Sequence, residues 1–205
     1  KGTFPLFSRP LKGKRLTLAP LEREDLEAVA PFFADTGALY YYLPDLLLPR
    51  SRAQLHAMMD EWNDGRRNFV FACRHAGRTI GLVTLSDLDP AMGNAETGIM
   101  IAGEEWRGKG FAAEAMELLL AYAFDELGLH RLYARVAVEN IPSLKLFRRL
   151  GFLEEGRLRE AMRRGGRFID LVLFGLLEAE YRKSVGEGRD CALHMLRLNL
   201  PACGD

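Results

Sequence analysis

The most specific chemistry in the sequence lies in residues 104–124, where a charged turn with two glycines runs directly into an apolar helical pattern. The first four amides of a helix have no acceptor within the helix, and they point out of its positive end. Gly108 and Gly110 allow a tight bend and a close approach of the backbone to a ligand, and Arg107 and Lys109 add positive charge. These features predict a site for phosphate or diphosphate. The alternative is an ordinary helix start with solvated basic side chains.

Two nucleotide-binding patterns come close to this turn and fail. Residues 103–110, GEEWRGKG, follow the P-loop spacing G-x-x-x-x-G-K-S/T up to its last position. There Gly110 lacks the hydroxyl group that would bind magnesium. The dinucleotide-binding pattern G-x-G-x-x-G does not occur at this turn. The sequence therefore argues against both nucleotide-binding classes.

The helix behind the turn should hold it rigidly. Apolar residues recur there at three- and four-residue steps, which predicts a single buried stripe. The stripe consists of Ala112, Met116, Leu119, Ala123 and Leu127, and the acidic residues Glu114, Glu117 and Asp125 are expected to lie away from it. A helix packed on the core directly after a strand at 95–102 would fix the turn beside that strand.

The remaining pattern predicts an α/β domain with a mixed sheet, rather than a sandwich or a helix bundle. Alternating or β-rich runs predict strands at 14–21, 68–76, 78–88, 95–102 and 130–138, and a hairpin over 152–177 that turns at Arg164–Gly166. Helical spacing predicts helices at 22–35, 51–65 and 140–152. Pro31 is expected to shorten or bend the first of these. Ser51 is expected to cap the second helix and Gly65 to end it.

Composition narrows the function classes. The chain has 205 residues with 28 Lys and Arg against 28 Asp and Glu, so its formal net charge is zero. This balance argues against a nucleic-acid-coating protein, which is usually basic. Three cysteines without metal-ligand or paired spacing indicate a reducing cytoplasm. No signal-peptide pattern or membrane-spanning apolar run is found, so a cytoplasmic protein without a metal site or a membrane span is expected.

The domain organisation is expected to be one domain over residues 1–183 and a C-terminal extension over 184–205. Glycines at 186 and 188 indicate a linker, and the apolar residues 193–200 indicate a docking segment for the body or for a second subunit. A homodimer is therefore one expectation for the extension.

A family resemblance joins these observations. Residues 107–112, RGKGFA, fit the signature Q/R-x-x-G-x-G/A of the GNAT acetyltransferase superfamily, and residues 140–152, NIPSLKLFRRLGF, resemble its second cofactor-side helix. The resemblance covers about residues 14–180. It is closest to the branch that acetylates ribosomal-protein N-termini, with polyamine acetyltransferases near. It implies a single α/β (α+β) domain with a twisted, mixed, mostly antiparallel sheet flanked by helices.

The resemblance also implies acetyl-CoA as cosubstrate and assigns residues to it. Its diphosphate would lie on the backbone amides of Gly108, Lys109, Gly110, Phe111 and Ala112, with Arg107 beside them. Its pantetheine would follow strand 95–102. A backbone N–H near Met100 or Ile101 would bind the thioester carbonyl as negative charge develops there. Asn140 would contact the pantetheine or cap its helix.

The acceptor amine must be neutral before it attacks. An α-amino group with a pKa of about 7.7–8.0 is roughly one-tenth neutral at pH 7, whereas a lysine-type amine near 10.4 is neutral about once in 2,500 molecules. Glu96, in the segment AETG on the strand that should face the thioester, is the candidate base, directly or through a water. The alternative is an ordinary exposed strand glutamate.

The leaving thiolate needs a proton. Many family members use a tyrosine on the second cofactor-side helix, but the matching residue here is Phe147. Ser143 matches the serine of the ribosomal branch and is the candidate donor. Its alternative is a local backbone hydrogen bond. A thiol with a pKa around 8.5 also leaves tolerably as thiolate near neutral pH.

The acceptor itself is left open by the sequence. The candidates for the wall of its site are Tyr40, Tyr41 and Tyr42 and the arginines Arg163, Arg164 and Arg167. An aromatic and basic wall favours a protein α-amine over a polyamine, which would need a strongly acidic pocket. Another small-molecule amine, such as an aminoglycoside or an amino-acid-like amine, is a further alternative. An acyl-CoA-binding module without turnover is the reading from another function class.

Overall fold

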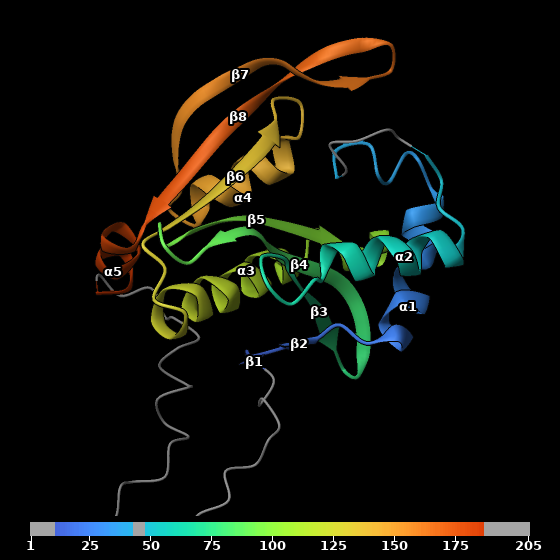
Figure 1. Ribbon diagram of the computed structural model, residues 1–205, viewed down its shortest axis with the longest axis horizontal. Helices are drawn as coiled ribbons and strands as arrows, with labels where there is room; N and C mark the ends of the chain where they lie inside the picture. Colours follow the sequence, from blue (N-terminus) through green and yellow to red (C-terminus); the bar gives the residue numbers. More distant parts are fainter. Residues whose placement is uncertain (1–10, 43–47, 187–205) are drawn as a thin grey trace, which may run out of the picture.

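The computed structural model describes residues 11–42 and 48–186. Figure 1 shows a curved sheet with helices against both of its faces and a long hairpin at one edge. The strands are β1 (Leu11–Lys12), β2 (Leu16–Pro20), β3 (Phe69–His75), β4 (Arg78–Asp89), β5 (Asn94–Ile101), β6 (Arg131–Ala137), β7 (Leu153–Arg164) and β8 (Arg167–Leu177). The helices are α1 (Arg23–Ala34), α2 (Arg52–Trp62), α3 (Phe111–Ala121), α4 (Ile141–Arg149) and α5 (Glu178–Gly186), with a 3₁₀ turn at Glu104–Trp106 and a π-helical turn at Tyr122–Glu126.

The described strands form one sheet in the order β1-β2-β3-β4-β5-β6-β8-β7. Every neighbouring pair is antiparallel except β5 and β6, which run parallel. The mixed, mostly antiparallel sheet expected from the resemblance is therefore confirmed. The hairpin over 152–177 is confirmed as well, because β7 and β8 are joined by Gly165 and Gly166 in left-handed conformation.

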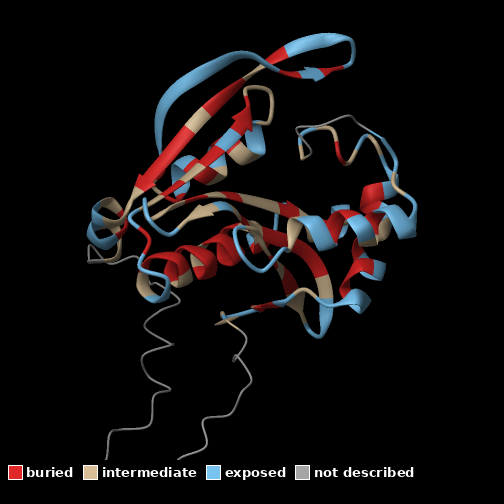
Figure 2. Cartoon of the chain, in the orientation of Figure 1, coloured by how far each residue is buried: buried red, intermediate tan, exposed pale blue. Residues whose placement is uncertain are grey.

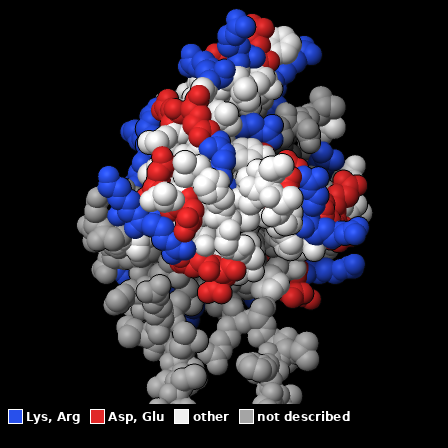
Figure 3. Space-filling view, turned by 60° about the vertical axis from the view of Figure 1, so that its left-hand side comes forward, with Lys and Arg blue, Asp and Glu red and all other residues white. Residues whose placement is uncertain are grey.

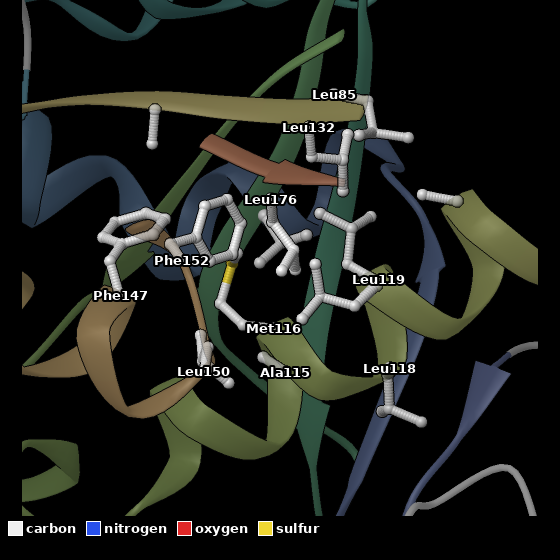
Figure 4. Close-up of a cluster of buried hydrophobic side chains, with 14 of the residues drawn as sticks. Leu85, Ala115, Met116, Leu118, Leu119, Leu132, Phe147, Leu150, Phe152 and Leu176 are labelled. Carbon is white, nitrogen blue, oxygen red and sulfur yellow. The ribbon is translucent and has the colours of Figure 1, made fainter. Parts of the chain in front are cut away.

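Two apolar cores cover the two faces of the sheet. On one face, α3, α4 and α5 pack against the sheet, and the labelled side chains Met116, Phe147 and Leu132 of Figure 4 belong to this core. On the other face, α1 and α2 pack against side chains such as Leu82 and Met100. Consecutive strand residues point to opposite faces, so neighbours in one strand contribute to different cores.

Several local expectations are confirmed by the backbone. Ser51 caps α2 by accepting a hydrogen bond from the amide of Gln54 at 3.3 Å. Ala76 and Gly77 turn β3 into β4 with φ of 47° and 78°, the left-handed pair of a tight hairpin turn. Pro31 does not end α1, which continues to Ala34.

The single-stripe expectation for α3 was wrong. Almost the whole helix is buried, as its red colour in Figure 2 shows. Glu114 is only 9% exposed, although it was expected to lie away from the core, and Leu127 is 40% exposed, although it was expected in the stripe. The reason is that Arg15 and the start of β2 pack against α3, where Glu114 accepts hydrogen bonds from the amides of Arg15 and Leu16.

Two elements near the ends of the described residues were not predicted. They are the short strand β1 and helix α5. The expected start of the extension at residue 184 falls inside α5. The rest of the extension, including the expected docking segment at 193–200, lies outside the described residues. No described helix has the length and apolar character needed to cross a membrane.

The surface is of mixed charge. On the face shown in Figure 3, basic and acidic side chains lie side by side, in keeping with their equal numbers. Cys73 is fully buried in β3, and burial raises the pKa of its thiol. Cys73 is therefore part of the core.

Candidate active site

Strands β5 and β6 part in the middle of the sheet. They pair only over Asn94–Glu96 and Arg131–Tyr133. Beyond these residues β5 pairs with β4 alone and β6 with β8 alone. One edge of β5 from Thr97 to Ile101 therefore has no neighbouring strand, and an extended ligand can add to such an edge like another strand. Met100 and Ile101, the residues expected beside the thioester, lie in this segment.

The loop after β5 leads directly into α3. Gly108 and Gly110 have φ of 70° and 82°, which only glycine adopts without strain. Gly110 is the N-cap of α3, and the first helical hydrogen bond runs from the amide of Glu114 to its carbonyl at 3.1 Å. Within the described part of the chain, none of the amides of residues 108–112 has a hydrogen-bond acceptor. Five unpaired donors thus gather at the positive end of α3.

Cationic and aromatic side chains surround this loop. The Lys109 ammonium and the Arg78 guanidinium lie 5.9 and 5.7 Å from the centre of the Trp106 ring, and the Arg15 guanidinium lies 4.5 Å from the centre of the Phe111 ring. These charges and the positive helix end favour a phosphate group at the loop. The loop thus has the features that favour a phosphate group, and the diphosphate site expected at residues 108–112 stays a prediction.

The loop is open to solvent on its outer side. Residues 102–107, but none of residues 108–112, form one wall of a groove of about 920 Å³ together with α1 and the turn between β3 and β4. Arg107 itself is exposed, and its Nε donates to the carbonyl of Ile101 at 3.4 Å, so it ties the loop to the end of β5.

Helix α4 begins at the far side of the parted strands. Asn140 caps it, because its Oδ1 accepts from the amide of Ser143 at 3.3 Å. Ser143 is half-buried in the first turn. Phe147 is 3% exposed and packs against the rings of Phe152 and Phe174 at 5.1 and 5.8 Å. This position is thus part of the core.

Glu96 lies at the point where β5 and β6 part. Both of its carboxylate oxygens accept from the guanidinium of Arg135, at 2.9 Å from Nε and 2.6 Å from Nη2. The hydrogen bond to Glu96 raises the pKa of Arg135. Burial raises the pKa of neighbouring Tyr133, and the negative charges of Glu96 and Asp87 raise it further.

Arg135 and Tyr133 were missed at the sequence level. The signal that could have found them is the alternation of β6, in which they lie opposite the buried Leu132, Ala134 and Val136. A charged residue on a central strand is rarely without a partner. The pairing with Glu96 itself depends on the parallel register of two strands that are far apart in the sequence.

The loop after α1 contacts the tip of the β7–β8 hairpin through the side chain of Arg164. The Nε of Arg164 donates to the carbonyl of Tyr40 at 2.6 Å, and Arg164 is only 3% exposed. Arg167 pairs with Glu139 through both carboxylate oxygens, at 2.8 and 2.9 Å. Glu139 also accepts a long hydrogen bond of 3.5 Å from the hydroxyl of Tyr41.

Four of the six residues expected to wall the acceptor site thus meet in one place. The other two do not join them. Tyr42 packs against the rings of Phe32 and Phe33 in the core beneath α1, and Arg163 is exposed. The structure describes no group of three or more acidic, histidine or cysteine side chains that could hold a metal ion in residues 11–42 and 48–186.

Comparison with known proteins identifies the family to which this chain is similar. Residues 15–153 match the family model of the acetyltransferase (GNAT) domain. The chain is 34% identical over 171 residues to p20, an uncharacterized N-acetyltransferase of Bacillus licheniformis, a match that covers 82% of this chain and 96% of p20. It is 40% identical over 105 residues to the putative ribosomal N-acetyltransferase YdaF of Bacillus subtilis, which covers 51% of this chain and 57% of YdaF.

A solved structure shows the same architecture. The crystal structure of spermidine N-acetyltransferase from Vibrio cholerae in complex with CoA and spermine aligns with a TM-score of 0.75 at 31% identity. The alignment covers 82% of this chain and 98% of the other. The parted strands and the loop before α3 therefore belong to a fold that binds CoA in a relative.

Proposed function

The chain belongs to the GNAT acetyltransferase family, and we propose that it transfers the acetyl group of acetyl-CoA to the N-terminal α-amine of a protein or peptide. The observation that carries this proposal is the unpaired edge of β5 next to five unpaired amides at the start of α3. Family membership supports an N-acetyltransferase over a binding module without turnover.

The residues fit the parts of the cosubstrate in order. The amides of residues 108–112 bind the diphosphate, with Arg107 beside them. The pantetheine pairs with the edge of β5, and an amide near Met100 or Ile101 donates to the thioester carbonyl. Asn140 holds the first turn of α4 in place, where Ser143 faces the departing sulfur.

The reaction needs two proton transfers. The neutral amine attacks the carbonyl carbon, a C–N bond forms and the C–S bond breaks. Glu96 takes the proton that the amine loses, directly or through a water. Ser143 either donates a hydrogen bond to the thiolate, which then takes a proton from solvent, or gives it a proton and regains one from solvent. CoA leaves as the free thiol.

The charges near the acceptor side favour an α-amine. Among the described residues there, Glu96 and Glu139 are each bound on both oxygens by an arginine. A polycation would have to displace these guanidinium groups.

A polyamine is the second candidate, because the aligned relative of Vibrio cholerae is a spermidine N-acetyltransferase solved with CoA and spermine. Release of the CoA thiol, measured with an amine panel, separates the two. The panel contains spermidine, spermine and three matched peptides: one with a free N-terminus and no lysine, one with a blocked N-terminus and one lysine, and one with both groups blocked.

We expect the peptide with the free N-terminus to show the highest kcat/KM and the fully blocked peptide to show no turnover. Mass spectrometry of the products should place the acetyl group on the α-nitrogen. Faster turnover of spermidine or spermine than of every peptide would contradict the α-amine proposal and favour the polyamine.

A further inference from the structure

Arg15 connects the start of β2 to the first turn of α3. Its Nε donates to Oε2 of Glu114 at 2.9 Å, and its backbone amide donates to Oε1 at 2.6 Å. The amide of Leu16 donates to the same Oε1 at 3.0 Å. Glu114 therefore holds both the main chain and the side chain of Arg15 against α3.

The guanidinium of Arg15 then reaches the loop before α3. Its Nη1 donates to the carbonyl of Lys109 at 2.9 Å, and its carbon lies 4.5 Å from the centre of the Phe111 ring. Its Nη2 lies 3.4 Å from the place where a Cβ on Gly110 would be. Arg15 thus touches three consecutive residues of the loop.

The contact with the Lys109 carbonyl has a geometric consequence. This carbonyl and the N–H of Gly110 belong to one planar, trans peptide unit, so they point in opposite directions. A carbonyl directed at Arg15 therefore directs the N–H of Gly110 away from Arg15. We propose that Arg15, held by Glu114, is a positioning residue that aims the Gly110 amide at the diphosphate of acetyl-CoA. This inference rests on the proposed diphosphate site.

Replacement of Arg15 tests the inference, because acetyl-pantetheine lacks the diphosphate. Arg15→Met should weaken the binding of acetyl-CoA by about tenfold or more, since one oriented hydrogen bond to a charged group is lost. The kcat/KM for acetyl-pantetheine should be unchanged. Arg15→Lys, which keeps the charge but not the forked geometry, should restore only part of the affinity for acetyl-CoA.

Arg182 on α5 provides a matched control, because it contacts the π-helical turn that follows the other end of α3. It bonds the carboxylate of Asp125, donates to the carbonyl of Phe124 at 3.4 Å and lies 5.8 Å from the centre of the Tyr181 ring. These are the three kinds of contact that Arg15 makes. Arg182→Met should therefore lower the thermal stability as Arg15→Met does, with unchanged affinity for acetyl-CoA.

The outcomes are distinct. Equal losses with acetyl-CoA and acetyl-pantetheine in Arg15→Met would show a merely structural role and overturn the inference. Unchanged affinity for acetyl-CoA in a folded Arg15→Met would also overturn it. If the unaltered protein itself fails to bind acetyl-CoA in calorimetry, the proposed diphosphate site fails first, and that result is recognisable without any variant.

Discussion

The carboxylate of Glu96 combines two properties that bear on catalysis. It lies where β5 and β6 part, and it is bound on both oxygens by Arg135. The amine must therefore compete with the guanidinium of Arg135 for an oxygen of Glu96. An α-amine, which is already neutral in a fair fraction of molecules near pH 7, needs the least help from such a base.

Glu96→Gln should lower kcat about a hundredfold, because a positioned general base contributes at least this factor, with little change in the affinity for acetyl-CoA. Steady-state kinetics and calorimetry check the two parts of this prediction. Asp87→Asn is the control, since Asp87 is an exposed carboxylate that acts on Tyr133, as Glu96 does. Unchanged turnover of Glu96→Gln would remove Glu96 from the mechanism.

Helix α4 carries a candidate hydrogen-bond donor for the leaving sulfur, Ser143, and a residue that packs in the core, Phe147. The first turn of α4, with Ser143, lies at the end that Asn140 caps. One turn later, Phe147 is enclosed by the rings of Phe152 and Phe174. A hydroxyl at position 147 would need a partner within an apolar core. The donor for the leaving sulfur is therefore proposed in the first turn.

At the scale of elements, the loop between β5 and α3 matters most for the proposed binding of acetyl-CoA. The strand ends where its partner β6 has already turned away, and α3 begins with a glycine in left-handed conformation. A side chain at Gly110 would be strained by its φ of 82° and would crowd the guanidinium of Arg15. The geometry of the loop thus depends on this residue having no side chain.

Gly110→Ala should lower the free energy of unfolding by about 1–2 kcal/mol, because an L-residue is strained in the left-handed region. It should also weaken acetyl-CoA binding. Gly128→Ala is the matched control, since Gly128 has a φ of 64° with open space around it. Denaturant unfolding and calorimetry should show similar destabilisation of both variants but weaker binding in Gly110→Ala alone. Equal affinities would contradict the role of the loop.

At the scale of the whole molecule, the buried carboxylate of Asp25 ties α1 to the sheet. Asp25 accepts two hydrogen bonds from Arg74 on β3, at 3.0 and 2.7 Å, and one from the hydroxyl of Thr79 on β4. Burial alone would raise the pKa of Asp25. The hydrogen bonds from Arg74 and Thr79 outweigh burial and hold the pKa below its ordinary value of 3.8.

A carboxyl with a depressed folded pKa stabilises the protein above its unfolded pKa, and this stabilisation is lost as the pH falls through the folded value. Asp25→Asn should therefore lower the free energy of unfolding by roughly 1–3 kcal/mol at pH 7. The difference from the unaltered protein should shrink between pH 4 and pH 2. Denaturant unfolding across this range measures it, and a difference that stays constant down to pH 2 would contradict the assignment.

The fold shared with relatives does not by itself select the acceptor. The aligned spermidine N-acetyltransferase and the putative ribosomal N-acetyltransferase YdaF both match this chain, YdaF over 51% of it. In this chain Arg164 and Arg167 of the hairpin hold Tyr40 and Glu139. We propose these contacts as the first ones to alter in a search for the residues that select the amine.

Much of this architecture was predictable from local patterns. Alternating residues predicted most strands, Ser51 predicted the start of α2, and the glycines at 165 and 166 predicted the turn between β7 and β8. These signals act between residues that are close in the sequence. The same holds for the loop before α3, whose glycines and following helix define its backbone. β1 and α5 were missed because one has two residues and the other is polar over most of its length.

The sequence by itself determined that a glycine turn opens α3, since backbone preferences of Gly108 and Gly110 and the helical pattern behind them are local properties. Only the tertiary structure decided which charged side chains pair. Glu114 pairs with Arg15, Glu96 with Arg135, and Glu139 with Arg167, and each pair joins separate elements. The register and curvature of the sheet bring these partners within reach, and both arise from the packing of the whole domain.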